Sequence, residues 1–228
     1  MFRLRRESSS SPAPSSPAPS SRALRRGKTV AASALTALMA TVGAIASSTP
    51  AAAGTYYNTC GQRITQQTFS AYGDTNEYFL PQEGDYETSS LSGWVLYNAG
   101  PVLGNNPFYL SRNRYDARSL KINPGGSAGS EVICVVPGED SIRFAYRSPG
   151  VSASALRVDI TVISALGTAS ASYTVAGSTA GWAVSPRMAI PNRVDYTGAQ
   201  SLKIRFTPTG TAAAWQVDDV YVDPWRTL

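Results

Sequence analysis

Hydrophobic and polar residues alternate with a period of two along much of the chain after residue 54. The clearest segments are SIRFAYR (141–147), LRVDITVI (156–163) and SLKIRFTP (201–208), in which every second residue is apolar. Such alternation is typical of a β-strand in a sheet with one buried face. We expect further, shorter strands at YFL (78–80), WVLY (94–97), FYL (108–110), SLKI (119–122), EVICVV (131–136), ASYTV (171–175), WAVSP (182–186) and WQVDDVYV (215–222).

Turn signals separate these segments. NAGP (98–101), NPGG (123–126) and PGED (137–140) combine Gly or Pro with Asn or Asp, as turns require. No segment after residue 54 has a convincing period of 3.6, so helices are not expected. Short strands at regular spacing with Gly/Pro turns predict an all-β fold, an antiparallel β-sandwich.

The first 53 residues have a different character. Ser/Pro-rich sequence (8–21) is expected to be disordered, and the basic segment RALRRGK (22–28) precedes the apolar stretch 29–46. Ala51-Ala52-Ala53 matches the small-residue cleavage rule, so this order predicts a secretory signal peptide rather than a membrane anchor. We therefore expect release before Gly54, with an N-terminal arm over 54–78 and a β-sandwich domain over 79–228. The predicted location is extracellular, with no stable membrane anchor after cleavage.

The basic charge is concentrated in that leader. The chain carries a formal net charge of +5, but seven of its 20 Lys and Arg residues lie before Gly54, against one acidic residue. The remaining sequence holds 13 basic and 14 acidic residues. Nucleic-acid binding needs clustered Lys and Arg, so we expect no nucleic-acid partner.

The sequence contains two cysteines, Cys60 and Cys134, and both follow the predicted cleavage point. In an exported protein this pattern predicts one disulfide that ties the arm to the sandwich, although two free thiols are the alternative. The bond would close a loop of about 75 residues and stabilise the fold by roughly 4–5 kcal/mol.

Histidine is absent from the sequence. Its absence excludes His-dependent nucleophile systems and His-ligated zinc or copper sites. With paired cysteines, thiolate chemistry is excluded as well, and carboxylates are the reactive groups left. A glycosidase-type carboxylate pair stays open, because such residues lie far apart in sequence. We predict a protein that is not an enzyme.

Two adjacent carboxylates, Asp218 and Asp219, interrupt the last predicted strand. In strict alternation Trp215, Val217 and Asp219 share one face, so Asp219 is expected to point inward and Asp218 outward. A buried carboxylate needs a hydrogen-bonding, ionic or metal partner. A calcium ion, which prefers oxygen ligands, and a pairing with arginine or turn amides are both consistent with the sequence.

GDYETSSLSGW (84–94) and WQVDDVYVDP (215–224) resemble the two ends of the galactose-binding-like jelly rolls of many carbohydrate-binding modules. FSAYGDT (69–75), YFLPQ (78–82) and GNNPF (104–108) add a similarity to a family of uncharacterised, secreted actinobacterial β-sandwich proteins. The resemblance implies a jelly-roll fold, and we expect either no cofactor or a structural Ca²⁺. It also implies that Glu87 and one of Asp218 and Asp219 are metal ligands.

Two hypotheses for function follow. The first is a secreted, non-catalytic binding module, with polysaccharide or another cell-envelope component as its partner. The second is an extracellular structural or protein-interaction protein with no small ligand. Sugar binding uses aromatic platforms and polar groups that exchange hydrogen bonds with hydroxyls. Residues outside the strand patterns or on their polar faces are the candidate ligand contacts: Tyr56, Tyr57, Tyr72, Trp225, Arg143, Arg147, Arg205 and Gln216.

Overall fold

The computed structural model describes the backbone of residues 54–58, 60–191 and 198–223, and the side chains of 60–191 and 198–223. These residues belong to one compact unit, Ser48–Leu228. The predicted signal peptide and Trp225 lie outside the described residues. Within the described ranges, no helix has the length and apolar character needed to span a membrane.

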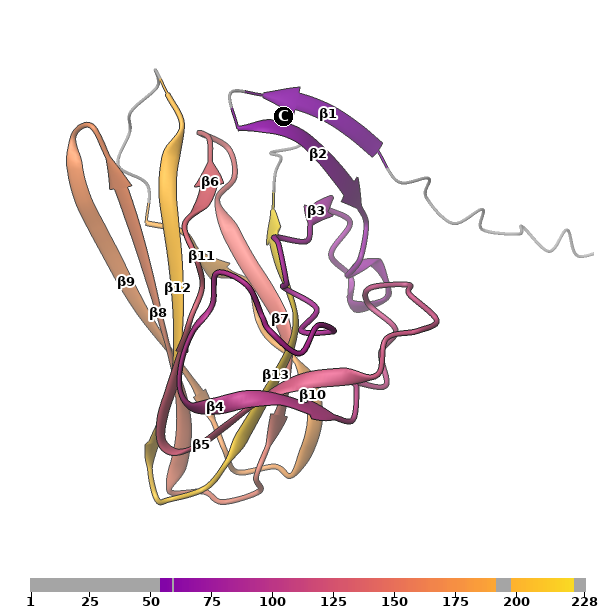
Figure 1. Ribbon diagram of the computed structural model, residues 1–228, viewed down its shortest axis with the longest axis vertical. Helices are drawn as coiled ribbons and strands as arrows, with labels where there is room; N and C mark the ends of the chain where they lie inside the picture. Colours follow the sequence, from indigo (N-terminus) through magenta and orange to yellow (C-terminus); the bar gives the residue numbers. More distant parts are fainter. Residues whose placement is uncertain (1–53, 59, 192–197, 224–228) are drawn as a thin grey trace, which may run out of the picture. The chain divides into compact units, whose positions relative to one another are not determined.

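Strands make up nearly all of the regular structure, which confirms the all-β prediction (Figure 1). A single 3-10 turn, Ser70–Tyr72, is the exception among the described residues. The strands are β1 (Gly54–Asn58), β2 (Gly61–Gln66), β3 (Tyr78–Phe79), β4 (Val95–Leu103), β5 (Arg118–Gly129), β6 (Ile133–Val135), β7 (Ser141–Ser148), β8 (Ser154–Ser164), β9 (Gly167–Ala176), β10 (Gly181–Val184), β11 (Met188–Ala189), β12 (Gln200–Gly210) and β13 (Trp215–Asp223).

All pairs among the described strands are antiparallel, and the sheet curls into two layers that face each other across one core. One layer runs β4–β5–β13–β7–β10, and the other runs β9–β8–β12–β6. Inward side chains from both layers form the main cluster, including Ile122, Phe144, Ile160, Phe206 and Trp215, each fully buried. The alternation in the sequence thus identifies the core face of these strands.

Strands β4 and β5 connect the two layers, because each bends in the middle. Their register shifts between Tyr97 and Ala99, and Asn98 adopts a positive φ of 47° at the bend. Beyond the bend, β5 pairs with β12 instead of β13. The Gly-rich sequence of β5 permits this corner: a Cβ on Gly126 would lie 2.7 Å from the carbonyl oxygens of both Tyr97 and Asn98.

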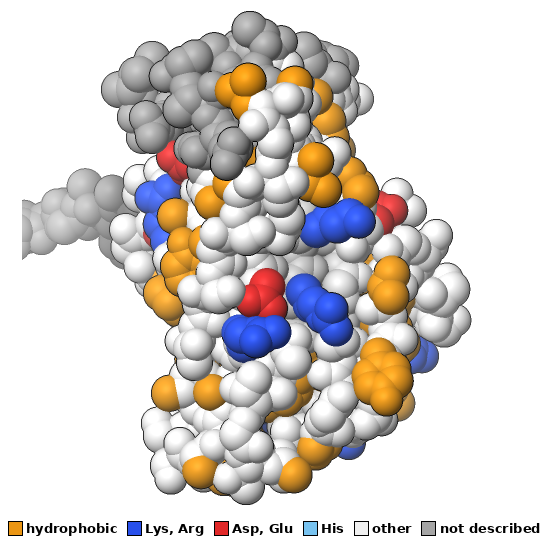
Figure 2. Space-filling model, turned by 90° about the vertical axis from the view of Figure 1, so that its left-hand side faces the viewer, with side chains coloured by type: hydrophobic (Ala, Val, Ile, Leu, Met, Phe, Trp, Pro, Cys, Tyr) orange, Lys and Arg blue, Asp and Glu red, His pale blue; other side chains and the backbone are white. Residues whose placement is uncertain are grey.

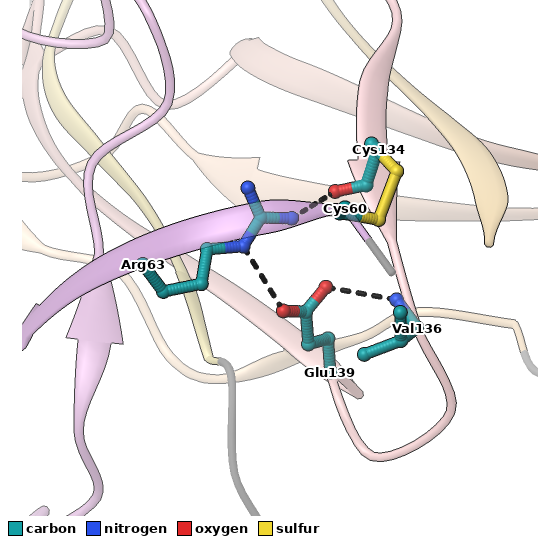
Figure 3. Close-up of a disulfide and its surroundings, with 5 residues drawn as sticks. All are labelled: Cys60, Arg63, Cys134, Val136 and Glu139. Carbon is teal, nitrogen blue, oxygen red and sulfur yellow. Dashed lines mark hydrogen bonds and ion pairs between the residues drawn. A yellow bond between two sulfur atoms is a disulfide. The ribbon is translucent and has the colours of Figure 1, made fainter. Parts of the chain in front are cut away.

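The segment predicted as an extended arm contains a hairpin of β1 and β2, which also pairs with β3 at Thr65 and Gln66. The predicted disulfide is present: Cys60 is bonded to Cys134, with the two Cα atoms 5.6 Å apart (Figure 3). Beside it, the Arg63 guanidinium donates to the Cys134 carbonyl and to Glu139, whose other oxygen accepts the Val136 amide 2.9 Å away. A covalent bond to β6 and a buried ion pair with the turn that follows β6 therefore fix the hairpin in place.

One predicted strand is wrong. FYL (108–110) lies in the loop between β4 and β5, where Tyr109 has a positive φ of 54°. Leu110 is buried in a second apolar cluster on the outer side of β7 and β13, and Phe108 packs against that cluster. The apolar character of these three residues thus reflects a loop that covers part of a sheet rather than a strand.

Candidate functional site

A cluster of three carboxylates lies where the β4–β5 loop covers β13. Oxygen atoms of Asp116, Asp218 and Asp219 all lie within 4.8 Å of one another. Both residues of β13 are completely buried, and Asp116 is half-buried. Asn106, from the same loop, donates its side-chain amide to Asp218 and to Asp219, at 2.9 Å in each case. Three acidic groups thus share a small volume from which water is largely excluded.

Asp218 and Asp219 are both buried because β13 contains a bulge that places the two side chains under the β4–β5 loop. The register between β13 and β7 shifts between Asp218 and Tyr221, and Asp219 has a positive φ of 50°, a conformation that Asp adopts more readily than most residues. After the bulge, Val220 and Val222 join the main core, and Tyr221 joins the cluster on the outer side. The predicted alternation therefore holds through Asp218 and is wrong from Asp219 onward, because Asp219 does not point into the main core.

Among the described residues, the negative charge of the three carboxylates is not balanced by a cation, because the group that donates to both Asp218 and Asp219 is the neutral amide of Asn106. Burial, and next the charge of Asp219, raise the pKa of Asp218 to about 9, while burial and the charge of Asp116 raise the pKa of Asp219 to about 7. One oxygen of Asp219 and one of Asp116 are buried without a hydrogen-bond partner. Oxygen donors that lack a partner match a hard divalent cation such as Ca²⁺ or Mg²⁺. The donor set of this cluster therefore fits such an ion.

Glu87 lies at the edge of this cluster rather than inside it. Its Oε1 atom accepts the backbone amides of Ala117 and Arg118, at 2.9 and 2.7 Å. Burial, and next a hydrogen bond with Asp116, raise the pKa of Glu87. It therefore stabilises the loop that carries Asp116, whereas the close group of carboxylate oxygens consists of Asp116, Asp218 and Asp219.

A second candidate site lies on the outer face of the β4–β5–β13–β7–β10 layer. Gln216 of β13 stands directly opposite Lys121 of β5 on one side and Arg147 of β7 on the other. The row continues to Trp182 of β10, opposite Arg147, and to Gly100 of β4, opposite Lys121. Residues directly opposite each other project from the same side of a sheet, so this row forms one surface.

This row borders a hollow of about 310 Å³, which is lined by Lys121, Arg147, Ser148, Pro149, Ala180, Gly181, Ala214 and Gln216. The Arg147 guanidinium donates to the side-chain oxygen of Gln216 at 3.1 Å. Gly100 leaves the β4 end of the row open, since nothing lies within 4 Å of an added Cβ. Two of the predicted contact residues, Arg147 and Gln216, are thus brought together here.

The other predicted contact residues are elsewhere or are not described. Arg143 is 8% exposed, and its guanidinium binds Asp74 at 2.8 Å above the ring of Phe69. Arg205 lies on β12 of the other layer and donates to Ser127. Tyr72 is half-exposed and packs edge-on against Phe108. The side chains of Tyr56 and Tyr57, and the whole of Trp225, lie outside the described residues.

Other surfaces are less distinctive. A larger hollow of about 560 Å³ lies between β2, β3 and β6, but its aromatic residues Tyr78, Phe79 and Tyr221 are buried and present no ring face. Figure 2 views the outer face of β9, β8 and β12, where a few charged side chains of both signs lie close together among uncharged side chains. Arg157 and Asp159 form an ion pair on that layer.

Sequence reasoning missed Asn106, Asp116, Lys121 and Trp182. Lys121 could have been found, because SLKI (119–122) was recognised as a strand and Lys121 is its polar position. Asn106 and Asp116 come from a loop whose path depends on tertiary contacts with β13, so no local pattern identifies them.

Comparisons with known proteins show similarity of shape alone. No protein-family model and no curated protein matches the chain. Similar solved structures include the enzymatically active domain of tailspike protein 4 of bacteriophage CBA120, with a TM-score of 0.44, 16% identity and coverage of 62% of this chain. The chain spans 21% of that domain's length.

Carbohydrate-binding modules are among the other similar structures. TmCBM61, in complex with β-1,4-galactotriose, has a TM-score of 0.42 and 14% identity, over 63% of this chain and 96% of the module. The C-terminal family 22 module of Clostridium thermocellum Xyn10B has a TM-score of 0.38 and 15% identity. The match covers 64% of this chain and 94% of the module. Likeness at this level assigns neither a ligand nor an activity to the chain.

Proposed function

We propose that this protein is a secreted, non-catalytic module that binds a saccharide on the outer face of the β4–β5–β13–β7–β10 layer. The observation that carries this proposal is the row of Lys121, Gln216, Arg147 and Trp182 across four neighbouring strands. A row that crosses the strands gives an extended ligand several adjacent contacts on a rigid support.

The chemistry of the row suits a polyhydroxylated ligand. Gln216 can donate and accept hydrogen bonds, and Lys121 and Arg147 provide several donors. Trp182 is half-buried and is the aromatic residue of the row, so its exposed part can contact the apolar face of a sugar ring. Acid–base hydrolysis requires two carboxyl groups about 5–9.5 Å apart, and the residues that line this hollow include none.

A structural divalent cation, Ca²⁺ in the first instance, is part of the same proposal. Asp116, Asp218 and Asp219 would hold it, and it would supply the positive charge that the buried cluster lacks. Because Asp116 belongs to the β4–β5 loop and the other two residues belong to β13, the ion would fix this loop to the sheet next to the binding face.

The alternative is an extracellular structural or protein-interaction role. Its supporting observation is the exposure of apolar side chains on β4, where Val95, Tyr97 and Leu103 are 74%, 69% and 77% exposed. Strand β4 pairs with β5 alone among the described strands, so its other edge is open to a partner. Retention by a protein with no retention by any polysaccharide would favour this role.

The experiment is a depletion assay with a panel of insoluble polysaccharides and cell walls, in calcium and in chelator. We expect retention on a polysaccharide that Gln216→Ala and Trp182→Ala weaken by roughly tenfold, as loss of a good contact does. Arg157→Ala, on the other layer, is the matched control and should be retained like the natural protein. If no polymer retains the protein, or if Arg157→Ala is as defective as the other two variants, saccharide binding at this face is rejected.

Export is tested separately. The N-terminus of protein recovered from the medium of a secreting host should begin at or near Gly54. Protein that stays in the cell with residues 1–53 attached would contradict the predicted signal peptide.

A further inference from the structure

We infer that the ligand of this face is an anionic polysaccharide, one whose sugar units carry carboxylate groups. This inference rests on the proposed function and adds to it the charge of the ligand. It starts from the two cationic side chains of the row, Lys121 and Arg147, which line the same hollow.

These two cations differ in their pairing from four of the other described arginines. Arg63, Arg143, Arg157 and Arg187 each form an ion pair with a carboxylate. Among the described residues, neither Lys121 nor Arg147 has such a partner, and the neutral Gln216 oxygen accepts the hydrogen bond of Arg147. The sheet therefore presents two positive charges that the protein itself does not neutralise.

The lining of the hollow adds no opposing charge. Its other residues are Ser148, Pro149, Ala180, Gly181, Ala214 and Gln216, all uncharged. The carboxylate that lies nearest along β13 is Asp218, two residues from Gln216 on the same side of the sheet. It is completely buried and hydrogen-bonded by Asn106, so it does not face the hollow. Among the described residues that line the hollow, the charged ones are therefore both cations.

The spacing of the charges indicates a polymer rather than a single small anion. Lys121 and Arg147 are separated by Gln216 on the strand between them, so their backbones are two strand spacings apart, roughly 10 Å. Two charges at this separation can contact acidic groups on different sugar units. Gln216 between them can pair with a hydroxyl group, and Trp182, which stands opposite Arg147 and packs against the second apolar cluster, flanks this row.

Carboxylate and phosphate groups share the chemistry that Arg and Lys recognise, so the experiment compares both sources. Isothermal titration would use four soluble probes: a galacturonic acid trimer, its methyl ester, a neutral galactose trimer and a short polyglycerol phosphate. The ester keeps the sugar backbone and removes the charge. Trimers are short enough to avoid gel formation in the presence of calcium.

We expect the acidic trimer to bind about tenfold or more tightly than its ester, since charge-assisted hydrogen bonds are roughly twice as strong as neutral ones. Its affinity should fall as salt is raised, because exposed charges are screened. Lys121→Gln and Arg147→Gln should each lose about tenfold in affinity for the acid and little for the ester. Lys203→Gln, at an exposed position on β12, is the control and should bind normally.

A second variant covers the case in which the first ones fold poorly. Gln216→Glu places a carboxylate between the two cations and should abolish binding of the acid while preserving the melting temperature. Equal binding of acid and ester, or preference for the phosphate polymer, would overturn the inference. If a neutral polysaccharide binds in a Gln216-dependent way and the acid does not, the inference fails and the proposed function stands. If none of the four probes binds, the inference fails, and the depletion assay decides the proposed function.

Discussion

The side-chain amide nitrogen of Asn106 lies 2.9 Å from a carboxylate oxygen of Asp218, a residue 112 positions later in the chain. The backbone amide of Asn106 donates to the same oxygen at 3.0 Å, and its side chain also reaches Asp219. One loop residue thus holds together the two carboxylates that the bulge of β13 buries. The stability of this region should depend on the charge state of the cluster.

The first prediction concerns pH. Asp218 and Asp219 have pKa values of about 9 and about 7 in the folded protein, against 3.8 as the reference value. Without a cation, the folded protein holds more protons than the unfolded chain between about pH 4 and pH 9, so the free energy of unfolding decreases as pH rises through that range. In chelator, the melting temperature should therefore fall steadily from pH 5 to pH 9.

Calcium should reverse this trend. A bound cation favours the ionised carboxylates, so the melting temperature in millimolar Ca²⁺ should rise above the chelator value, and the difference should grow with pH. Differential scanning calorimetry at several pH values measures both effects. Identical melting curves with and without Ca²⁺ at pH 8 would show that the cluster holds no such ion.

The second prediction concerns Asn106. Asn106→Ala removes two side-chain hydrogen bonds to buried carboxylates and the one that its Oδ1 atom accepts from the Phe108 amide. Leaving buried polar groups unpaired costs about 1–3 kcal/mol each, so we expect destabilisation of roughly 3 kcal/mol in urea unfolding. Asn113→Ala, at an exposed position in the same loop, is the control and should cost less than about 1 kcal/mol. Equal effects of the two substitutions would contradict this role for Asn106.

The fold was predictable from sequence because alternation reports directly on burial. Leu156, Val158, Ile160 and Val162 alternate with polar residues, and all four are completely buried. The bulge at Asp219 was not predictable, because one added residue reverses the phase of every later side chain without changing composition. Because the bulge could not be located from sequence, the burial of both Asp218 and Asp219 could not be predicted.

The candidate sites were predictable only in part. Arg147 and Gln216 were identified because both occupy polar positions of recognisable strands. Their meeting depends on the pairing of β13 with β7. Arg143, on the same side of β7, is buried in an ion pair with Asp74, and Arg205 lies on the other layer. Strand order is a property of the whole topology, so a list of polar positions cannot show which of them share a face.

The third prediction concerns the attachment of the N-terminal hairpin. The Glu139 side chain is completely buried and Arg63 is 11% exposed, so their ion pair is nearly enclosed. Arg63→Met removes the ion pair between Arg63 and the buried Glu139 carboxylate and should destabilise the fold by about 3–5 kcal/mol. The double variant Arg63→Met/Glu139→Gln removes the charge as well and keeps an acceptor for Val136, so it should recover much of the loss. Urea unfolding of both variants checks this, and a double variant weaker than the single one would contradict it.

The fourth prediction concerns the corner between the two layers. A Cβ at residue 126 would lie 2.7–2.9 Å from three backbone carbonyl oxygens, those of Tyr97, Asn98 and Asn123, and rigid backbone cannot move away cheaply. Gly126→Ala should therefore destabilise the protein by about 1–3 kcal/mol through overpacking. Gly100→Ala is the matched control on the same pair of strands, because an added Cβ there has nothing within 4 Å and should change the unfolding free energy by less than about 0.5 kcal/mol. If both variants unfold at the same urea concentration as the natural protein, the tight corner does not determine stability, and the bend in β4 and β5 must be fixed by the strand pairing on either side of it.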